Sequence, residues 1–526
     1  MAGGQTIMLP EPAEYLAPDA LDHEIFEATV PQDHYLRRVH TVIDFERFRA
    51  DMVSCYSANH GRPATEPLLL LKLEFLEYQY NLADQSVVEQ ARFNMAFRYF
   101  LNLSLKSPLP HHTLLTKFRN RLGVEKHQKI FEDVVAQARM HGLVKDRLRL
   151  KDATHVIANI AIPSTVRLVA ETRQQLLDAL RAYQPEQVAV EEERAATIHK
   201  ATADLSGEER LLQRVTHLRD IVTWIEESIA VGSLAPSTEP AWQAVQEALQ
   251  IAHKVLADRE NPKSKDRLVT LQDPDARWGE HHVHYAGYLL DVAEDADSGI
   301  ITALNVLPAN GDEARDASTL IEQEERAHGN DVDALSMDGA GCKGELLREW
   351  TDPQGLNLDV IVPPRPRPKA AEYFGVDQFT LTPDGEAMIC PAGQTSNQRF
   401  RNRHNSGWVF RFTRKVCAAC PLLSQCIAKL QKAKGRQVST NDYEAEYQAI
   451  EAKAQTPAYQ EIRRQHRRIE RKLGELVRWH RLRRARYRGR MRVLLQSLLT
   501  ALVVNIKCVV RSLAAPPVRA EGLTSP

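Results

Sequence analysis

A change in hydrophobic periodicity near residue 147 constrains the fold of this chain more than any other feature. Before it, residues 31–145 carry helix-length apolar runs such as LLLLKLEFLEYQYN. After it, RLRLKDATHVIANI alternates and is rich in β-branched residues, which is typical of a strand. Helical spacing returns over residues 170–260, and strand-like segments resume at Asp266. This order predicts an α+β fold, a mixed α/β core that a helical segment interrupts.

The interrupting segment carries two apolar seams. Their members alternate spacings of three and four residues, in two groups: Leu211, Val215, Leu218, Val222 and Ile225, then Trp242, Val245, Leu249, Ala252 and Leu256. We therefore expect two antiparallel helices, a helical hairpin, that pack along these seams.

Charge is distributed unevenly along the chain. The 526 residues hold 68 Lys and Arg and 69 Asp and Glu, and this net charge of −1 predicts no partner by itself. Residues 461–492, however, hold 14 Lys or Arg and three acids, a local charge of +11. Such a segment suits either a polyanionic partner or a solvated helical face.

The ends of the chain indicate no membrane association. The segment MAGGQTIMLPEPAEYLAPD has neither the basic nor the long apolar region of a secretory signal. The apolar run VLLQSLLTALVVNIKCVVRSL contains Gln496, Asn505 and Lys507, so we expect a buried or amphipathic helix. Seven cysteines, clustered near residue 400, fit a reducing compartment. These features predict a cytoplasmic protein without a membrane partner.

Three carboxylates from separate elements are candidates for one metal site. Asp152 lies in the strand-like LRLKDATHV, and Asp338 ends another such run, ALSMD, where the chain turns through Gly339. Glu470 lies in the helical RRQHRRIERKLGEL, and Glu475, roughly 140° further around that helix, is the alternative third acid. Oxygen ligands suit hard cations such as Mg²⁺ and Mn²⁺, which assist phosphoryl transfer. Among 69 acids, however, most triplets are ordinary surface residues.

The cysteines form a second candidate site. Four of them have the spacing C-x26-C-x2-C-x5-C: Cys390, Cys417, Cys420 and Cys426. Structural zinc needs four ligands in a tetrahedron, and a C-x2-C knuckle supplies two of them. His404 is a competing ligand, and ordinary buried or free thiols are the alternative. The other three cysteines are expected to be bystanders: Cys55, Cys342 and Cys508.

A glycine pattern offers a different hypothesis. Gly339, Gly341 and Gly344 spell G-x-G-x-x-G after a strand, and Asp359 follows Gly339 by 20 residues, as in dinucleotide-binding proteins. No repeated βαβ units surround the pattern, which disfavours an oxidoreductase.

Several segments, taken in order, resemble bacterial DDE transposases of insertion sequences. They are KDATHVIANI, SMDGAG and RRIERKLGELVRWHRLRRARYRGR, with DPDARWG and HYAGYLLDV between them. GRPATEPLLLLKLEFLEYQYNLADQSVVEQARFNMAFRYFLNLSL and HHTLLTKFRNRL resemble the helical region that precedes the core of these enzymes. The resemblance covers most of the chain except residues 170–260 and the tails. It implies a ribonuclease-H-like core preceded by an all-helical domain.

The resemblance also implies the chemistry. Asp152, Asp338 and Glu470 would be catalytic and would hold Mg²⁺ or Mn²⁺. The enzyme would hydrolyse phosphodiesters at the element's terminal inverted repeats and join the freed ends to target DNA, with double-stranded DNA as partner and a homodimer in the synaptic complex. The arginines expected to bind DNA are Arg467, Arg471, Arg478, Arg481 and Arg484. Similar cysteine-bearing inserts in these enzymes favour zinc.

Two positions depart from the family pattern. Many relatives have a tyrosine where this chain has Gly341, and a lysine often follows the glutamate by seven residues, where this chain has Val477 beside Arg478. These departures leave open a DNA-binding protein that has kept the fold and lost catalysis. Trp479, between arginines, is expected to pack in the core rather than to stack on a base.

The expected organisation has six parts. They are an arm (1–30), a helical DNA-binding domain (31–145), a catalytic core in three pieces (146–169, 262–380 and 440–512), a helical insertion (170–261), a cysteine-rich zinc insert (385–435) and a tail (513–526).

Overall fold

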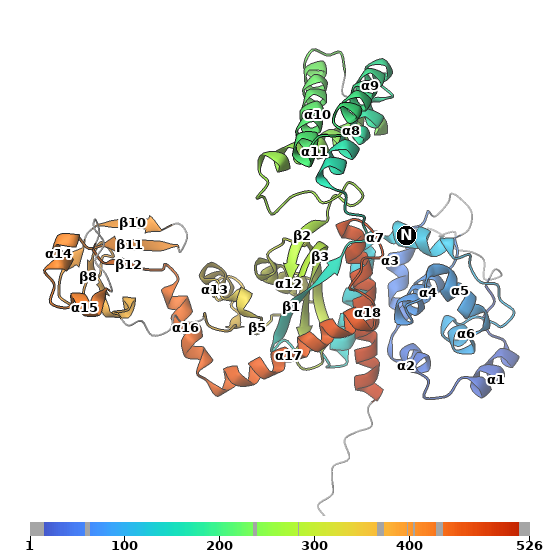
Figure 1. Cartoon of the computed structure of the whole chain (residues 1–526). Helices are drawn as coiled ribbons and strands as arrows, with labels where there is room; N and C mark the ends of the chain where they lie inside the picture. The colour runs from blue at the N-terminus through green and yellow to red at the C-terminus, as the bar shows by residue number, and fades with distance from the viewer. Residues whose placement is uncertain are drawn as a thin grey trace, which may run out of the picture. The chain divides into compact units, whose positions relative to one another are not determined.

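The chain divides into two compact units. The computed structural model describes residues 15–57, 64–234, 239–281, 283–365, 373–396, 398–402, 406–427 and 435–514 (Figure 1). The first unit is Met1–Lys145, Ala153–Glu313 and Glu470–Pro526, and the second is Asp146–Asp152 and Ala314–Ile469. Strand β1 (Arg149–Ile157) and helix α17 (Pro457–Arg478) each contribute to both units. The predicted mixture of helices and strands is confirmed.

The N-terminal part of the first unit is helical, as predicted. Its helices are α1 (Ala20–Thr29), α2 (Tyr35–Val42), η1 (Phe45–Phe48), α3 (Arg49–Val53), α4 (Pro67–Gln79), α5 (Asp84–Phe93), α6 (Met95–Leu101) and α7 (Thr113–Met140). Helix α1 falls within the expected arm, because Asp19 and Asp22 form a capping box that starts a helix there. Residues 1–14 of that arm lie outside the described residues.

Helix α4 is buried along its length and carries charges into the core. Glu74 and Glu77 are less than 3% exposed. Arg119 of α7 forms ion pairs with both, with Nη1 2.7 Å from Glu77 Oε2 and 3.6 Å from Glu74 Oε1. Arg486 Nη1 donates to the other Glu77 oxygen at 2.9 Å. Because buried charges need partners, this cluster ties the helical region to the segment that follows α17.

The insertion contains four helices in place of the two expected. The predicted seams form α10 (Gly207–Ala230) and α11 (Pro240–Glu260). Helices α8 (Thr165–Leu180) and α9 (Pro185–Ala201) pack with these two helices in one bundle (Figure 1). Leucines of α8 share an apolar cluster with both seams, so α8 completes a core that two helices alone leave open.

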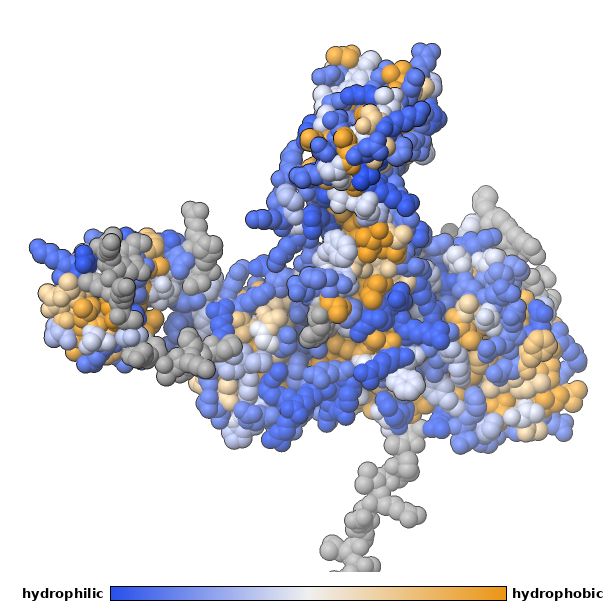
Figure 2. Space-filling view, in the orientation of Figure 1, coloured by the Kyte–Doolittle hydropathy of each residue, from blue (hydrophilic) through white to orange (hydrophobic). Residues whose placement is uncertain are grey.

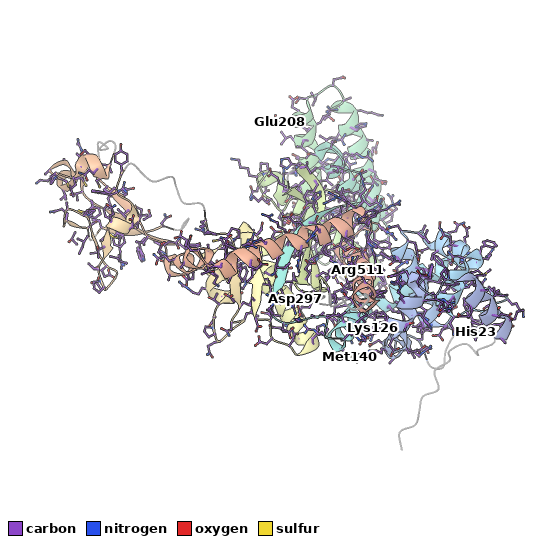
Figure 3. All side chains as sticks on the ribbon, turned by 90° about the horizontal axis from the view of Figure 1, so that it is seen from below. His23, Lys126, Met140, Glu208, Asp297 and Arg511 are labelled. Carbon is purple, nitrogen blue, oxygen red and sulfur yellow. The ribbon has the colours of Figure 1, made fainter. Side chains whose placement is uncertain are left out.

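An antiparallel sheet forms the rest of the first unit. Strands β2 (Arg277–His281) and β4 (Ile301–Pro308) flank β3 (Val283–Asp295), and Asp297, labelled in Figure 3, lies in the β3–β4 turn. The C-terminal half of β1 lies beside β3, where the Ala158 amide donates to Ala286. Their approach is close, since a Cβ at Gly287 would lie 2.1 Å from the Val156 carbonyl oxygen.

Helix α18 (Arg490–Ala514) is the core helix of the first unit. Among the described residues it is the one helix long and apolar enough to cross a membrane, and 89% of its most apolar window is buried inside the protein. Its polar Asn505 exchanges two hydrogen bonds with the Ile301 backbone, at 2.7 and 2.8 Å. This pairing supports the expected buried helix. Residues 515–526 of the expected tail lie outside the described residues.

The second unit contains a parallel sheet. The N-terminal half of β1 pairs with β5 (Ala334–Ser336), which pairs with β6 (Asp359–Ile361). The other elements are α12 (Glu313–His328), η2 (Gly339–Gly341), α13 (Gly344–Trp350), α16 (Glu444–Ala454) and most of α17. Arg149 of β1 and Glu324 of α12 form an ion pair of 2.6 Å, and both side chains are 0% exposed.

Residues 374–441, which we call the cysteine module, have a core of their own within the second unit. Short strands make two three-stranded sheets: β7 (Thr380–Leu381), β8 (Met388–Ile389) and β9 (Thr395–Ser396), then β10 (Arg399–Asn402), β11 (Gly407–Arg411) and β12 (Gln437–Ser439). The small helices are η3 (Val376–Gln378), α14 (Arg414–Ala418) and α15 (Leu423–Cys426). Phe379, Met388, Phe410, Phe412 and Val438 fill the core. Figure 2 shows hydrophobic residues gathered over α14 and α15.

The buried Arg149–Glu324 pair makes a stability prediction. Glu324→Ala removes the buried carboxylate that pairs with Arg149, so we expect a loss of about 3–5 kcal/mol in the free energy of unfolding. Urea denaturation measures the change. Arg219→Ala, which removes an exposed pair with Glu260, is the control and should cost less than about 1 kcal/mol. Equal effects of the two variants would contradict the prediction.

Candidate active site

Strand register brings Asp152 and Asp338 to the same level of the parallel sheet. Leu150 of β1 is the partner of Ser336 of β5. Each aspartate follows its paired residue by two positions, and side chains two residues apart in extended chain share a face. Neighbouring strands lie about 4.8 Å apart. The two carboxylates therefore belong to one edge of the sheet in the second unit.

Asp338 lies where β5 gives way to a tight turn. Its backbone is extended, and Oδ1 accepts a hydrogen bond of 2.9 Å from the Ala340 amide, which caps η2. Asp338 is exposed, whereas Asp152 is half-buried. The capping bond fixes the direction of the Asp338 carboxylate and leaves its second oxygen for another partner.

The glycine that replaces the family tyrosine has a packing explanation. A Cβ at Gly341 would lie 2.4 Å from the Met337 sulfur, so the Met337 side chain occupies the space that a larger residue would need. Gly344, the last glycine of the G-x-G-x-x-G pattern, is packed against Tyr443, whose Cβ would lie 2.1 Å from an added Cβ. Gly341 and Gly344 thus serve close packing of this loop, whereas nothing lies within 4 Å of a Cβ added at Gly339.

The guanidinium of Arg463 in α17 lies near both aspartates. Its Nη1 donates to the Met337 carbonyl at 2.8 Å and to Ser336 Oγ at 3.3 Å, so it holds the end of β5. Burial lowers the pKa of the Arg463 guanidinium, and attraction to Asp338 and Asp152 opposes that shift. An arginine stays charged in this setting, so a fixed cation lies near both carboxylates.

His466, one turn further along α17, supports the same strand end. Its Nδ1 lies 3.2 Å from Ser336 Oγ, and the side chain is buried. Burial, together with the nearby charge of Arg463, lowers the pKa of His466 to about 4. The imidazole is therefore neutral at pH 7.

Arg463, His466 and Ser336 were missed by the sequence analysis. The available signal was helical spacing: Arg463 and His466 precede Glu470 by seven and four residues, which puts all three on one face of a helix with 3.6 residues per turn. Their contacts with β5 depend on tertiary packing, which no local pattern encodes.

The two candidate glutamates of α17 differ in their surroundings. Glu470 is exposed and is the first residue of α17 that belongs to the first unit. Glu475 accepts a hydrogen bond of 2.8 Å from Lys507 Nζ and lies 3.7 Å from Lys472 Nζ. Burial raises the pKa of Glu475, but the Lys507 hydrogen bond and both lysine charges outweigh it and hold that pKa below its usual value. Glu475 is thus engaged in an ion pair within the first unit.

The five arginines expected to bind DNA are all exposed: Arg467, Arg471, Arg478, Arg481 and Arg484. The expectation that Trp479 packs in the core is wrong, because its side chain is 72% exposed. Leu476, His480 and Leu482 take the buried positions around it. In the first unit, Arg481 and Arg484 also line a cavity of about 920 Å³ with Arg483, Arg486 and Arg119.

The four clustered cysteines line one small cavity of the cysteine module, between Phe379 and Phe412. Burial raises the pKa of the Cys426 thiol, Arg436 lowers it, and the other three cysteines raise it. The Arg436 amide donates to Cys417 Sγ at 3.4 Å. Within the described part of the chain, no three His, Cys, Asp or Glu side chains are grouped to hold a metal ion. His404 lies outside the described residues.

Comparison with protein families identifies two regions. Residues 24–121 match a transposase domain, DUF772, and residues 389–510 match a transposase DDE domain. No curated protein and no solved structure matches the chain. The two family matches support an insertion-sequence DDE transposase, which confirms the resemblance stated from the sequence. The two matched regions support a transposase function.

The low pKa of His466 predicts a pH-dependent stability. An unfolded histidine has a pKa near 6.5, so between about pH 6.5 and 4 the unfolded state binds more protons than the folded state. Stability should therefore fall as the pH drops through this window, by up to about 3 kcal/mol from this group. Urea unfolding at pH 7 and pH 4.5 measures the slope. His466→Gln should flatten it, and an unchanged slope in the variant would contradict the assignment.

Proposed function

We propose that the chain hydrolyses phosphodiesters at the ends of an insertion sequence and transfers the freed ends to target DNA, with Asp152 and Asp338 as two of its catalytic residues. The observation that carries this proposal is the shared register of the two aspartates on β1 and β5, with the Arg463 cation beside them. Strands β1, β5 and β6 are parallel, Asp152 lies in β1, and Asp338 follows β5. This arrangement is compatible with a ribonuclease-H-like core.

The donor set fits a divalent cation. Asp152 and Asp338 supply carboxylate oxygens, which Mg²⁺ and Mn²⁺ prefer. When bound, such a cation activates an attacking oxygen and stabilises the charge on the leaving oxygen. The Ala340 amide holds the Asp338 carboxylate in a fixed direction. Arg463 keeps the β5 end in place and offsets repulsion between the two acids.

Glu470 is the third acid of this proposal. It follows Arg463 by seven residues in α17, and its exposed side chain makes no ion pair with another described residue that would compete for a ligand role. Glu475 is less suitable, because Lys507 already occupies one of its oxygens.

Double-stranded DNA is the proposed partner of the basic segment around the end of α17. Exposed arginines neutralise phosphates without reading sequence. Exposure of Trp479 between Arg478 and Arg481 adds an aromatic surface on which a base can stack. The Arg486–Glu77 contact and the Arg119 cluster hold this segment against the helical N-terminal region.

Cleavage of DNA that carries the element's ends tests the catalytic proposal. Asp152→Asn, Asp338→Asn and Glu470→Gln should each lower Mg²⁺-dependent strand cleavage by roughly a thousandfold or more, since each removes a ligand charge from a site that acts as a unit. Glu475→Gln, on the same helix, is the matched control and should retain cleavage. A wild-type protein that binds end DNA and never cuts it would instead support the catalytically inactive alternative.

We further propose that the cysteine module holds one structural zinc through Cys390, Cys417, Cys420 and Cys426. The common cavity of the four sulfurs and the amide donated to Cys417 support this. Purified protein should contain about one zinc per chain by elemental analysis. Cys420→Ser should lose it, whereas Cys55→Ser, outside the module, should not. Zinc-free wild-type protein with an intact module would refute the proposal.

A further inference from the structure

The cysteine module is basic to an unusual degree. The 55 residues from 387 to 441 hold ten Lys and Arg and no Asp or Glu. At the chain's average of 69 acids in 526 residues, a segment of this length would hold about seven. A zinc ion held by four thiolates contributes only two negative charges. The positive charge therefore needs another explanation.

The sheet of β10, β11 and β12 arranges several of these cations around aromatic rings. Arg401 is the cross-strand partner of Trp408, and the guanidinium carbons of Arg399 and Arg401 lie 4.2 and 5.4 Å from the centre of that ring. On the opposite face, the guanidinium of Arg411 lies 5.0 Å from the Phe400 ring. Stacking of this kind holds a planar guanidinium in one orientation.

Two of these three arginines pair with an acid in the described part of the chain and the third does not. Arg399 pairs with Glu386 and Arg401 with Asp442, the acids that border the acid-free segment. Arg411 makes no ion pair among the described residues, and its buried Nε has no hydrogen-bond partner there. Phe400 beside it is 42% exposed. Lys415 on α14 is exposed as well. An oriented guanidinium without an acidic partner among the described residues suits a phosphate group.

We propose that the β10–β11–β12 sheet and α14 form a second DNA-contacting surface, which grips the phosphate backbone of duplex DNA independently of the arginines of α17. The inference rests on the proposed function, since DNA is the polyanion that a transposase handles. Arg411 and Lys415 supply the phosphate contacts. Contact with phosphates carries no sequence information, so this surface serves any duplex.

The test uses the full chain and a labelled duplex of arbitrary sequence, with fluorescence anisotropy over a range of salt concentrations. Each phosphate contact adds about 0.9 to the slope of log affinity against log salt. Arg411→Gln/Lys415→Gln should therefore lower the slope by about 1.8. Arg194→Gln/Arg219→Gln removes the same charge from exposed ion pairs of the helical bundle, and should leave the slope unchanged.

Lys415→Glu guards against misfolding, because this position is exposed and is not among the core residues of the module. Reduced duplex affinity in both variants, with zinc content and circular dichroism as in the wild type, supports the inference. An unchanged slope overturns it, as does a loss confined to single-stranded DNA, which would indicate base stacking on Phe400. Repeating the titration in Asp152→Asn separates the two proposals, since failure of catalysis leaves the salt slope intact.

Discussion

Parallel pairing of β1 with β5 is the interaction on which the candidate active site depends. Because Leu150 faces Ser336, the acids two residues further on come to the same edge of the sheet. Neither strand is held by this ladder alone. The buried Arg149–Glu324 pair anchors β1 to α12, and Arg463 and His466 of α17 hold the end of β5. A shift of one residue in the register would turn one carboxylate to the other face of the sheet.

The sequence predicted those parts of the fold that local patterns encode. Alternation identified β1, and seams of three and four residues identified α10 and α11. Helix α1 falls where the sequence predicts an arm, because its start depends on a capping box of two aspartates. Family resemblance named Asp152, Asp338 and Glu470, but the supporting Arg463 and His466 emerged only from packing. For Trp479 the prediction from residue type was wrong, because this large aromatic residue was expected in the core and is exposed.

Charged residues of this nearly neutral chain are paired and buried in one region and exposed and mostly basic in two others. Buried cations and acids cancel in the helical region, where Arg119 lies among Glu74, Glu77 and Asp84. Near the end of α17 and in the cysteine module, by contrast, exposed arginines and lysines have few acidic partners. Both basic regions lie within or next to the residues that match the DDE domain. A transposase must hold DNA at several points while two strands are cut and joined, and separate phosphate-binding surfaces would meet that requirement.

Anomalous diffraction from crystals of the protein soaked in Mn²⁺ tests the central claim most directly, because it locates the ion independently of activity. We expect one manganese peak between β1 and β5, with oxygens of both Asp152 and Asp338 at ordinary coordination distances from the ion. In Asp338→Asn crystals the peak should weaken or vanish. Manganese bound elsewhere, with Asp152 and Asp338 on opposite faces of the sheet, would contradict the account.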